Sequence, residues 1–484
     1  MKKIIFSILI IIAIISSFCF VNFNNNKSQN IETSLTEPID SLLAVRTKPN
    51  INRKATPEFV QAIYLTAYTV ANNRFDIILQ KAKIAGINTI VFDVKEMQGY
   101  VHLPIKDNPK IKYLSQENIW DIEDIVKKIH SYDMVAVARI VQFFNIETAK
   151  KHTDLLIQNK EGGYWSENSR RPMWLDPSNP EVQQDLIELV DMLGHTNVDE
   201  IQLDYVRFPT EGRLSNASFY FQREDAIKAQ TDSSYIKREK KDIITGFLKD
   251  LDEVCKFNEV RLTADVFAIV AWQRNIDIRN TGQDIAMMTP YLSQFHPMIY
   301  SSHFNRDFNN RLDDIYNKPY SIVKEGLELA IKKSDPNCLV IPYLQAFNWK
   351  VFYDKQYMFD QLRATVDAGC KGYILWNAGN AYDRTLNWIR EWNFPNEYQA
   401  PPDPPRIKKP KKDSLDKETK VDSFNIATIV DSTRDSLPIK IDSVFVEPEI
   451  VDIDSTDTLL EKAKADSVEV EIKKGSSIKN LKRN

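Results

Sequence analysis

Residues 199–209 read DEIQLDYVRFP, and this stretch decides how the middle of the chain is interpreted. The run Glu200–Val206 has the length and the apolar content of a buried strand, with Gln202 and Asp204 inside it. A carboxylate in an apolar strand costs free energy unless the group is paired or used. The segment therefore predicts a strand that carries Asp204 to a functional position.

Outward from this strand, apolar strand-like runs alternate with segments of helical period. The other seven predicted strands are Ile63–Tyr68, Thr89–Glu96, Val135–Phe143, Arg261–Phe267, Pro297–Ser301, Leu339–Phe347 and Gly372–Asn377. The predicted helices are Phe75–Ala85, Ile122–Ser131, Glu181–Leu193, Tyr235–Lys256, Tyr320–Lys333, Gln356–Ala368 and Thr385–Glu391. Eight such alternations predict an α/β fold, a closed (β/α)8 TIM barrel over residues 59–396. An open doubly wound sheet is the alternative, but it normally carries a Gly-rich first turn that this sequence lacks.

Both ends of the chain have a different composition from the barrel region. Lys2 and Lys3 precede an apolar run, so residues 1–21 are predicted to be a signal peptide, or a signal anchor if they stay uncleaved. Residues 22–58 are a polar tether, and residues 397–484 form a tail rich in Lys, Asp and Ser that we predict to be disordered. The signal predicts an extracytoplasmic protein, which is periplasmic, secreted or held at the membrane, with a tail that could contact an envelope partner.

Composition argues against several classes of function. The net charge is −4 and the pI is near 6.0, so nothing indicates a nucleic-acid partner. The chain has 13 Gly and neither G-x-G-x-x-G nor G-x-x-x-x-G-K, so no nucleotide cofactor is expected. No H-E-x-x-H spacing occurs, and no metal site is predicted. For Cys338 and Cys370, either a disulfide bridge or two buried free thiols is open, and free thiols are the preferred reading.

Polar residues stand at the ends of most predicted strands, where a barrel builds its active site. Asp93, Asp204 and Asp265 would form a carboxylate cluster at the mouth of the barrel. In such a cluster one carboxyl can stay protonated while another is ionised, which is the pair that glycoside hydrolysis needs. We therefore expect Asp204 and Asp265 to be catalytic. The expected substrate-binding residues are Asp93, Glu96, Arg139, Arg207, Tyr300, His303, Gln345, Trp376 and Asn377.

Four segments resemble a family of bacterial barrel proteins regarded as glycoside hydrolases. They read WLDPSNPEV at 174–182, DEIQLDYVRFP at 199–209, MIYSSHF at 298–304 and GYILWNA at 372–378. The resemblance covers about residues 60–395 and extends more distantly to barrels of the α-amylase and α-galactosidase type. It implies a carbohydrate substrate and Asp204 as the nucleophile. The amylase type has a Glu as its acid on strand 5, where this chain has Asp265.

Each assignment has a structural alternative. Asp204 could form a structural salt bridge with Arg139 or Arg207, and Asp265 could be a hydrogen-bonded carboxylate of the barrel. Asp93 or Glu96 is the alternative acid, His303 could be an ordinary rim residue, and Trp376 is either a sugar platform or a barrel plug. For the whole protein, the prediction is a retaining glycoside hydrolase. The alternative is a carbohydrate-binding or envelope scaffold barrel without catalysis.

Overall fold

The computed structural model describes residues 51, 53–167, 172–305, 308 and 314–392 of the 484-residue chain. The predicted signal at 1–21, most of the tether at 22–58 and the predicted tail at 397–484 lie outside the described residues. Among the helices that the structure describes, none is both long enough and apolar enough to span a bilayer.

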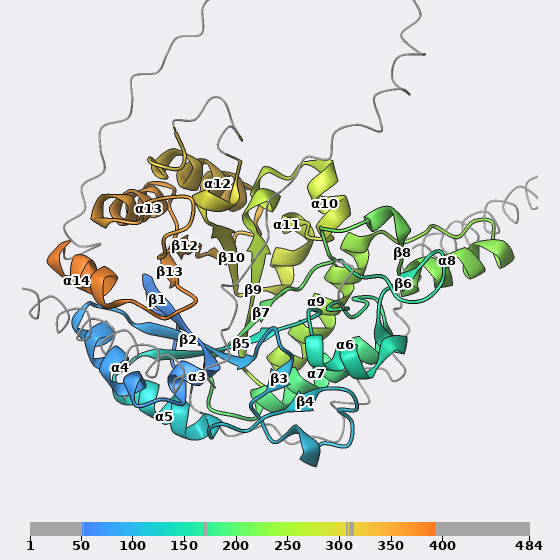
Figure 1. The fold of residues 1–484 in the computed structure, drawn as a ribbon, viewed down its shortest axis with the longest axis horizontal. Coiled ribbons are helices and arrows are strands. Elements are labelled where there is room, and N and C mark those ends of the chain that lie inside the picture. The colour runs from blue at the N-terminus through green and yellow to red at the C-terminus, as the bar shows by residue number, and fades with distance from the viewer. Residues whose placement is uncertain (1–50, 52, 168–171, 306–307, 309–313, 393–484) are drawn as a thin grey trace, which may run out of the picture. The chain divides into compact units, whose positions relative to one another are not determined.

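The described residues form a closed barrel of parallel strands (Figure 1). Its order is β1-β13-β12-β10-β9-β7-β5-β2, and β1 also pairs with β2, which closes the ring. These strands are β1 (Val60–Leu65), β2 (Thr89–Lys95), β5 (Val135–Val141), β7 (Glu200–Asp204), β9 (Arg261–Phe267), β10 (Gln294–Ile299), β12 (Tyr343–Gln345) and β13 (Gly372–Trp376). A short strand, β11 (Leu339–Val340), also pairs with β10. The predicted TIM barrel is confirmed, and the open doubly wound sheet is ruled out.

Helices cover the outside of the barrel between successive strands. The longer ones are α4 (Arg74–Ile84), α5 (Ile122–Ser131), α7 (Pro180–Gly194), α8 (Tyr220–Thr231), α9 (Lys240–Phe257), α12 (Tyr320–Lys333), α13 (Lys355–Asp367) and α14 (Asp383–Trp392). The shorter ones are α3 (Ala67–Val70), α6 (Ile146–Lys151), α10 (Asn275–Thr281) and α11 (Ile285–Met288). All the predicted helices are present, and α5 and α12 have the predicted bounds.

Local sequence explains where these helices start. Asp121 caps α5 by accepting hydrogen bonds from the backbone N–H groups of Glu123 and Asp124. Asn179 caps α7 in the same way, with Pro180 at the first helical position, as the Asn-Pro pair predicts. Capping satisfies backbone donors that have no partner within the helix, so each start is well defined.

Several boundaries differ from the predictions. β10 begins at Gln294 and not at Pro297, and the predicted strand Leu339–Phe347 is divided into β11 and β12. Two further differences have a clear local cause. β1 runs from Val60 to Leu65, three residues before the predicted Ile63–Tyr68, because Thr66 caps the short helix α3. The helix predicted at Tyr235–Lys256 begins only at Lys240. The preceding residues turn back onto α8, where the Asp225 carboxylate accepts hydrogen bonds from the backbone and the guanidinium of Arg238. Side-chain caps and anchors of this kind override the apolar period.

Long connections after three adjacent strands add structure at the C-terminal end of the barrel. After β2 come β3 (Tyr100–Val101), antiparallel to β2, and β4 (Ser115–Gln116), parallel to β3. After β5 comes β6 (Gln158–Asn159), which pairs with β8 (Ala217–Ser218) from the connection after β7. In a barrel of this kind, such connections build the functional face.

Candidate active site

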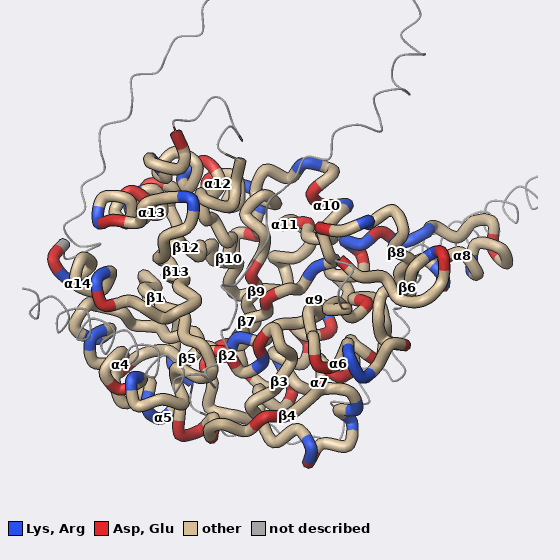
Figure 2. Tube along the Cα trace, viewed as in Figure 1, with Lys and Arg blue, Asp and Glu red and all other residues tan. Residues whose placement is uncertain are grey.

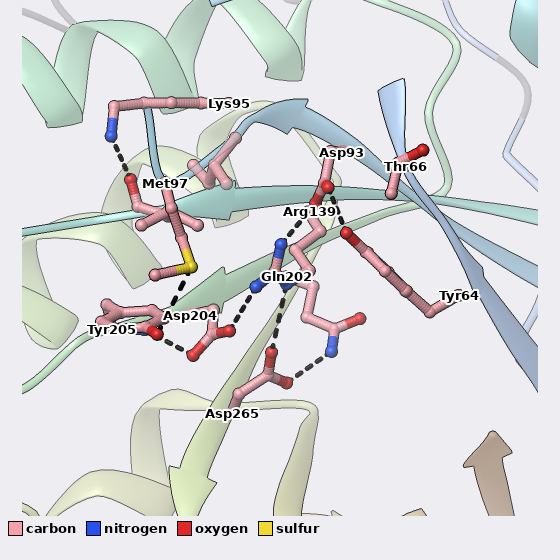
Figure 3. Close-up of polar contacts among 12 residues, drawn as sticks. Tyr64, Thr66, Asp93, Lys95, Met97, Arg139, Gln202, Asp204, Tyr205 and Asp265 are labelled. Carbon is pink, nitrogen blue, oxygen red and sulfur yellow. Dashed lines mark hydrogen bonds and ion pairs between the residues drawn. The ribbon is translucent and has the colours of Figure 1, made fainter. Parts of the chain in front are cut away.

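Three carboxylates from three strands converge on one guanidinium inside the barrel (Figure 3). Arg139 of β5 donates to Asp93 of β2 through Nη1, and to Asp204 of β7 through Nη2 at 2.5 Å. Its Nε lies 3.8 Å from Oδ2 of Asp265 on β9. In Figure 2, acidic and basic positions lie together around β2, β7 and β9. The carboxylate cluster predicted from the sequence therefore exists, and Arg139 is its centre.

Strand register explains this convergence. Asp93 pairs with Arg139 across β2 and β5, and Val141 pairs with Asp204 across β5 and β7. Side chains two residues apart on a strand share a face, so Arg139 and Val141 point to the same side. Arg139 is buried and contacts side chains of both neighbouring strands, so that side is the interior of the closed barrel. In a barrel interior, residues from adjacent strands stack in layers.

Asp265 is the most deeply buried of the three carboxylates, with 1% of its side chain exposed. Its Oδ1 accepts a hydrogen bond from the Gln202 amide, which also donates to the Tyr343 hydroxyl at 3.0 Å. Within the described residues, its Oδ2 has no hydrogen-bond partner. Burial, followed by repulsion from Asp204, raises the pKa of Asp265 well above its usual range. A protonated Asp265 is the chemical state that this surrounding favours.

Asp93 and Arg139 are tuned by the same balance of burial and charge. Burial raises the pKa of Asp93, while Arg139 and the Tyr64 hydroxyl, which donates to its Oδ2, act in the opposite direction. Burial alone would lower the pKa of Arg139, but Asp93 and Asp204 raise it well above the usual value. The guanidinium therefore stays charged and compensates part of the negative charge around it.

Asp204 stands at the last position of β7, beside a strained residue. Its Oδ1 accepts a hydrogen bond of 2.6 Å from the backbone N–H of Tyr205, whose φ is +52°. A positive φ is costly for a residue with a large side chain, and such strain is concentrated at functional sites. The Tyr205 hydroxyl in turn reaches Sδ of Met97 at 3.5 Å. Both oxygens of Asp204 are thus held in defined directions.

Arg207 does not join this cluster. Its guanidinium lies 3.9 Å from the ring centre of Phe267, 4.8 Å from that of Trp174 and 5.2 Å from that of Tyr205. Burial lowers its pKa. Of the two arginines expected near Asp204, Arg139 pairs with it, and Arg207 occupies an aromatic cage instead.

Aromatic side chains line the opposite side of the barrel interior. The indole of Trp376 lies 6.2 Å from the ring of Tyr64 at an interplanar angle of 20°, and 5.8 Å from the ring of Tyr300. Phe347 contacts it edge-on at 5.2 Å. Trp376 remains partly exposed, so part of its ring is accessible to a ligand.

The remaining expected ligand-binding residues have other partners in the structure. Gln345 is fully buried and accepts a hydrogen bond from Ser302 while donating to the carbonyl of Phe347. Asn377 donates to the carbonyl of Ala346 at 2.6 Å. Both side-chain amides are therefore used in hydrogen bonds within the protein.

Two further expected residues, His303 and Glu96, are not part of the Arg139 cluster. The His303 ring contacts the rings of Tyr300 and Trp349 at tilted angles, and burial lowers its pKa to about 4, so its ring is neutral. Glu96 lies outside the Arg139 cluster, in a separate group with His102 and Glu117.

Sequence reasoning missed Tyr64 and Gln202, which donate hydrogen bonds to the carboxylates. It also missed Tyr343, whose hydroxyl accepts a hydrogen bond from the Gln202 amide. The signal was present for Gln202, which stands two residues before Asp204 and must share its face of the strand. Tyr64 and Tyr343 look like ordinary aromatic residues of apolar strands, and only barrel closure brings their hydroxyls to the site.

The three free cysteines of the described residues, Cys255, Cys338 and Cys370, are all buried. The preferred reading of free thiols is therefore confirmed, and the Cys338–Cys370 bridge is absent. Burial raises the pKa of each thiol, so none resembles an activated nucleophile.

The family model described as "Putative glycosyl hydrolase domain" matches residues 62–382. Among curated proteins, no sequence matches the chain. A solved hypothetical protein from Ruminiclostridium thermocellum is 27% identical over 42% of this chain and 97% of its own, with a TM-score of 0.34. The PgaB (BpsB) glycoside hydrolase domain from Bordetella bronchiseptica is 10% identical over 69% of this chain and 98% of its own, with a TM-score of 0.52. The catalytic domain of β-amylase from Paenibacillus polymyxa is 12% identical over 70% and 98%, with a TM-score of 0.46. The likeness to the PgaB (BpsB) domain, with a TM-score above 0.5 at 10% identity, supports the fold alone.

Proposed function

This chain belongs to the family described as "Putative glycosyl hydrolase domain", and from that premise we propose that it is a retaining glycoside hydrolase with Asp204 as nucleophile and Asp265 as acid/base. The observation that carries the proposal is the pair of carboxyls on the adjacent strands β7 and β9, with Arg139 beside both. One carboxyl is paired with a cation, while the other has a raised pKa. Two carboxyls in contrasting environments are what glycoside hydrolysis requires.

Asp204 suits the role of nucleophile because both of its oxygens are oriented by donors. Arg139 donates to Oδ2 and the Tyr205 backbone N–H donates to Oδ1. In the first step, an Asp204 oxygen bonds to the anomeric carbon as the bond to the leaving oxygen breaks. The proton of Asp265 passes to that leaving oxygen. In the second step, Asp265 removes a proton from water, which attacks the anomeric carbon and releases Asp204.

Retention is favoured by the spacing of the strands. β7 and β9 pair in parallel through Gln202 with Thr263 and Leu203 with Ala264. Extending this register by one residue puts Asp204 beside Asp265. Neighbouring strands are about 4.8 Å apart. Retaining enzymes have carboxyls about 5–5.5 Å apart, while inverting enzymes need about 6.5–9.5 Å.

Burial of the carboxyls favours a second candidate function. Asp204 is 5% exposed and Asp265 is 1% exposed, and Arg139 is shared among three carboxylates. A purely structural ion cluster would have the same features. In that case the barrel would bind carbohydrate or serve as an envelope scaffold without cleaving its ligand.

We further propose that the substrate is an extracytoplasmic carbohydrate and that the uncleaved or cleaved N-terminal segment directs export. The support is sequence alone: Lys2 and Lys3 before an apolar run. The Lys-, Asp- and Ser-rich tail is proposed to contact an envelope partner. A reporter fused after residue 60 should be active outside the cytoplasm, and activity confined to the cytoplasm would refute the export claim.

The function is tested with purified wild type, Asp204→Asn and Asp265→Asn on a panel of chromogenic glycosides and cell-wall polysaccharides. Asp124→Asn, which alters an exposed carboxylate on α5, is the matched control and should keep full activity. On any substrate that wild type cleaves, Asp204→Asn should lose at least about 10³-fold in kcat, while its thermal unfolding shows an intact fold. NMR of the first product should show retained anomeric configuration.

Near-normal turnover by Asp204→Asn would remove it as nucleophile. Ligand binding by both wild type and Asp204→Asn, with no cleavage by either, would establish the second candidate.

A further inference from the structure

A second group of polar side chains lies beside the barrel, outside the Arg139 cluster. Glu96, His102 and Glu117 each offer one ligand atom, and these atoms all lie within 4.8 Å of one another. From these residues we propose a binding site for a divalent transition-metal ion, with Zn²⁺ as its best-suited occupant. The proposal does not rest on the proposed hydrolysis, because metal binding can be measured directly.

The three residues come together through the pairing of short strands. Glu96 follows β2, His102 follows β3 and Glu117 follows β4. The backbone N–H of His102 donates to the Val94 carbonyl, which fixes it against β2. Parallel pairing of β3 with β4 ends at Val101 and Gln116, so the next position in register sets His102 beside Glu117. Backbone hydrogen bonds therefore place the ligands before any ion arrives.

The imidazole of His102 provides the strongest sign of a missing partner. The residue is 1% exposed, and its Nδ1 lies 2.5 Å from the backbone carbonyl of Glu117. A carbonyl only accepts, so Nδ1 carries the proton and Nε2 carries the lone pair. Within the described residues Nε2 has no hydrogen-bond partner. In metal sites, a ligating histidine typically donates its other ring N–H to a carbonyl or carboxylate in this way.

The hydroxyl of Tyr68 lies close to both carboxylates. The Tyr68 hydroxyl lies 3.1 Å from Oε2 of Glu117 and 3.4 Å from Oε1 of Glu96. One hydroxyl has one proton and can donate to only one of these oxygens at a time. A cation among these oxygens would remove the repulsion between the two carboxylates.

The donor set indicates the kind of ion. One imidazole nitrogen and two carboxylate oxygens suit Zn²⁺ or Mn²⁺, whereas Ca²⁺ and Mg²⁺ prefer oxygen ligands alone. Zn²⁺ bonds to nitrogen and oxygen at about 2.0–2.2 Å, so two ligand atoms on one ion lie at most about 4.4 Å apart. The half-buried Glu96 and Glu117 side chains would close the remaining gap by rotation.

The test is calorimetric titration of ZnCl₂ into the full chain, without a histidine tag and after treatment with a chelator. We expect one saturable site per chain. His102→Gln and Glu117→Gln should each weaken Zn²⁺ binding at least about tenfold. Glu328→Gln, an exposed carboxylate on α12 whose side chain is 53% accessible, is the matched control and should bind Zn²⁺ as wild type does.

Absorption spectra of the Co²⁺ form give a readout independent of affinity. We expect bands of nitrogen and oxygen coordination without thiolate charge transfer, and their loss in both variants. The absence of saturable Zn²⁺ binding to wild type would overturn the proposal. So would wild-type affinity in folded His102→Gln and Glu117→Gln, thiolate bands in the Co²⁺ spectrum, or a preference for Ca²⁺ or Mg²⁺ over Zn²⁺.

Discussion

Replacing Arg139 by Met should destabilise the barrel strongly and in a way that depends on pH. The guanidinium contacts Asp93 and Asp204 directly and lies 3.8 Å from Asp265, and 9% of its side chain is exposed. Removing one partner of a buried ion pair costs about 3–5 kcal/mol, because it leaves an uncompensated charge. We expect a loss of that order in the free energy of unfolding at pH 8.

The direction of the pH effect follows from the carboxyls left behind. Burial already raises the pKa of Asp93 and Asp265, and loss of Arg139 would raise both further. A group whose folded pKa is raised contributes stability that is fully present below its unfolded pKa and is lost as the pH rises through its folded pKa. The destabilisation by Arg139→Met should therefore be largest at pH 8 and smaller at pH 5.

Urea unfolding followed by circular dichroism at the two pH values measures this effect. Arg279→Met is the control, since Arg279 is exposed on α10 and its replacement should cost less than about 1 kcal/mol. A loss below about 1 kcal/mol for Arg139→Met at pH 8 would refute the reasoning. So would a loss that grows as the pH falls.

Four other predictions concern separate parts of the molecule. If Asp265 is the acid, activity should fall as the pH rises through its raised pKa, and Asp265→Glu should shift this basic limb of the profile; an unmoved limb would assign it to another group. Burial raises the pKa of Asp250 to about 7, so Asp250→Asn should raise the free energy of unfolding by about 1–3 kcal/mol at pH 8 and by less at pH 5, measured by urea unfolding. Gly372→Ala should lower Tm by several degrees, because its φ is +149° and a Cβ would lie 2.2 Å from the Val60 carbonyl oxygen where β1 closes against β13; an unchanged Tm would contradict this contact. Trp376→Ala should raise KM by about fivefold with little change in kcat if the indole stacks against substrate, and an equal fall in kcat would argue for a plug that holds the barrel's shape.

The sequence predicted most residues of the candidate site, but it predicted fewer of the contacts between them. The expected carboxylates on β2, β7 and β9 meet, because polar residues in apolar strands of a barrel must share its interior. Glu96 is different, since it follows the end of β2, where the chain turns into the β3–β4 extension. No metal site was expected, because the sequence has no ligand spacing such as H-E-x-x-H within one element. The three proposed metal ligands instead come from the ends of three strands.

The sequence by itself determined the alternation of strands and helices, the caps at Asp121 and Asn179, and the strand positions of Asp93, Asp204 and Asp265. These follow from local periodicity and capping, which act over a few residues. Only the tertiary structure decided that Arg139, and not Arg207, pairs with Asp204. It also set the Tyr64 and Tyr343 hydroxyls near the carboxylates. The physical reason is that these contacts depend on the register between strands and on closure of the ring, which join residues far apart in the chain.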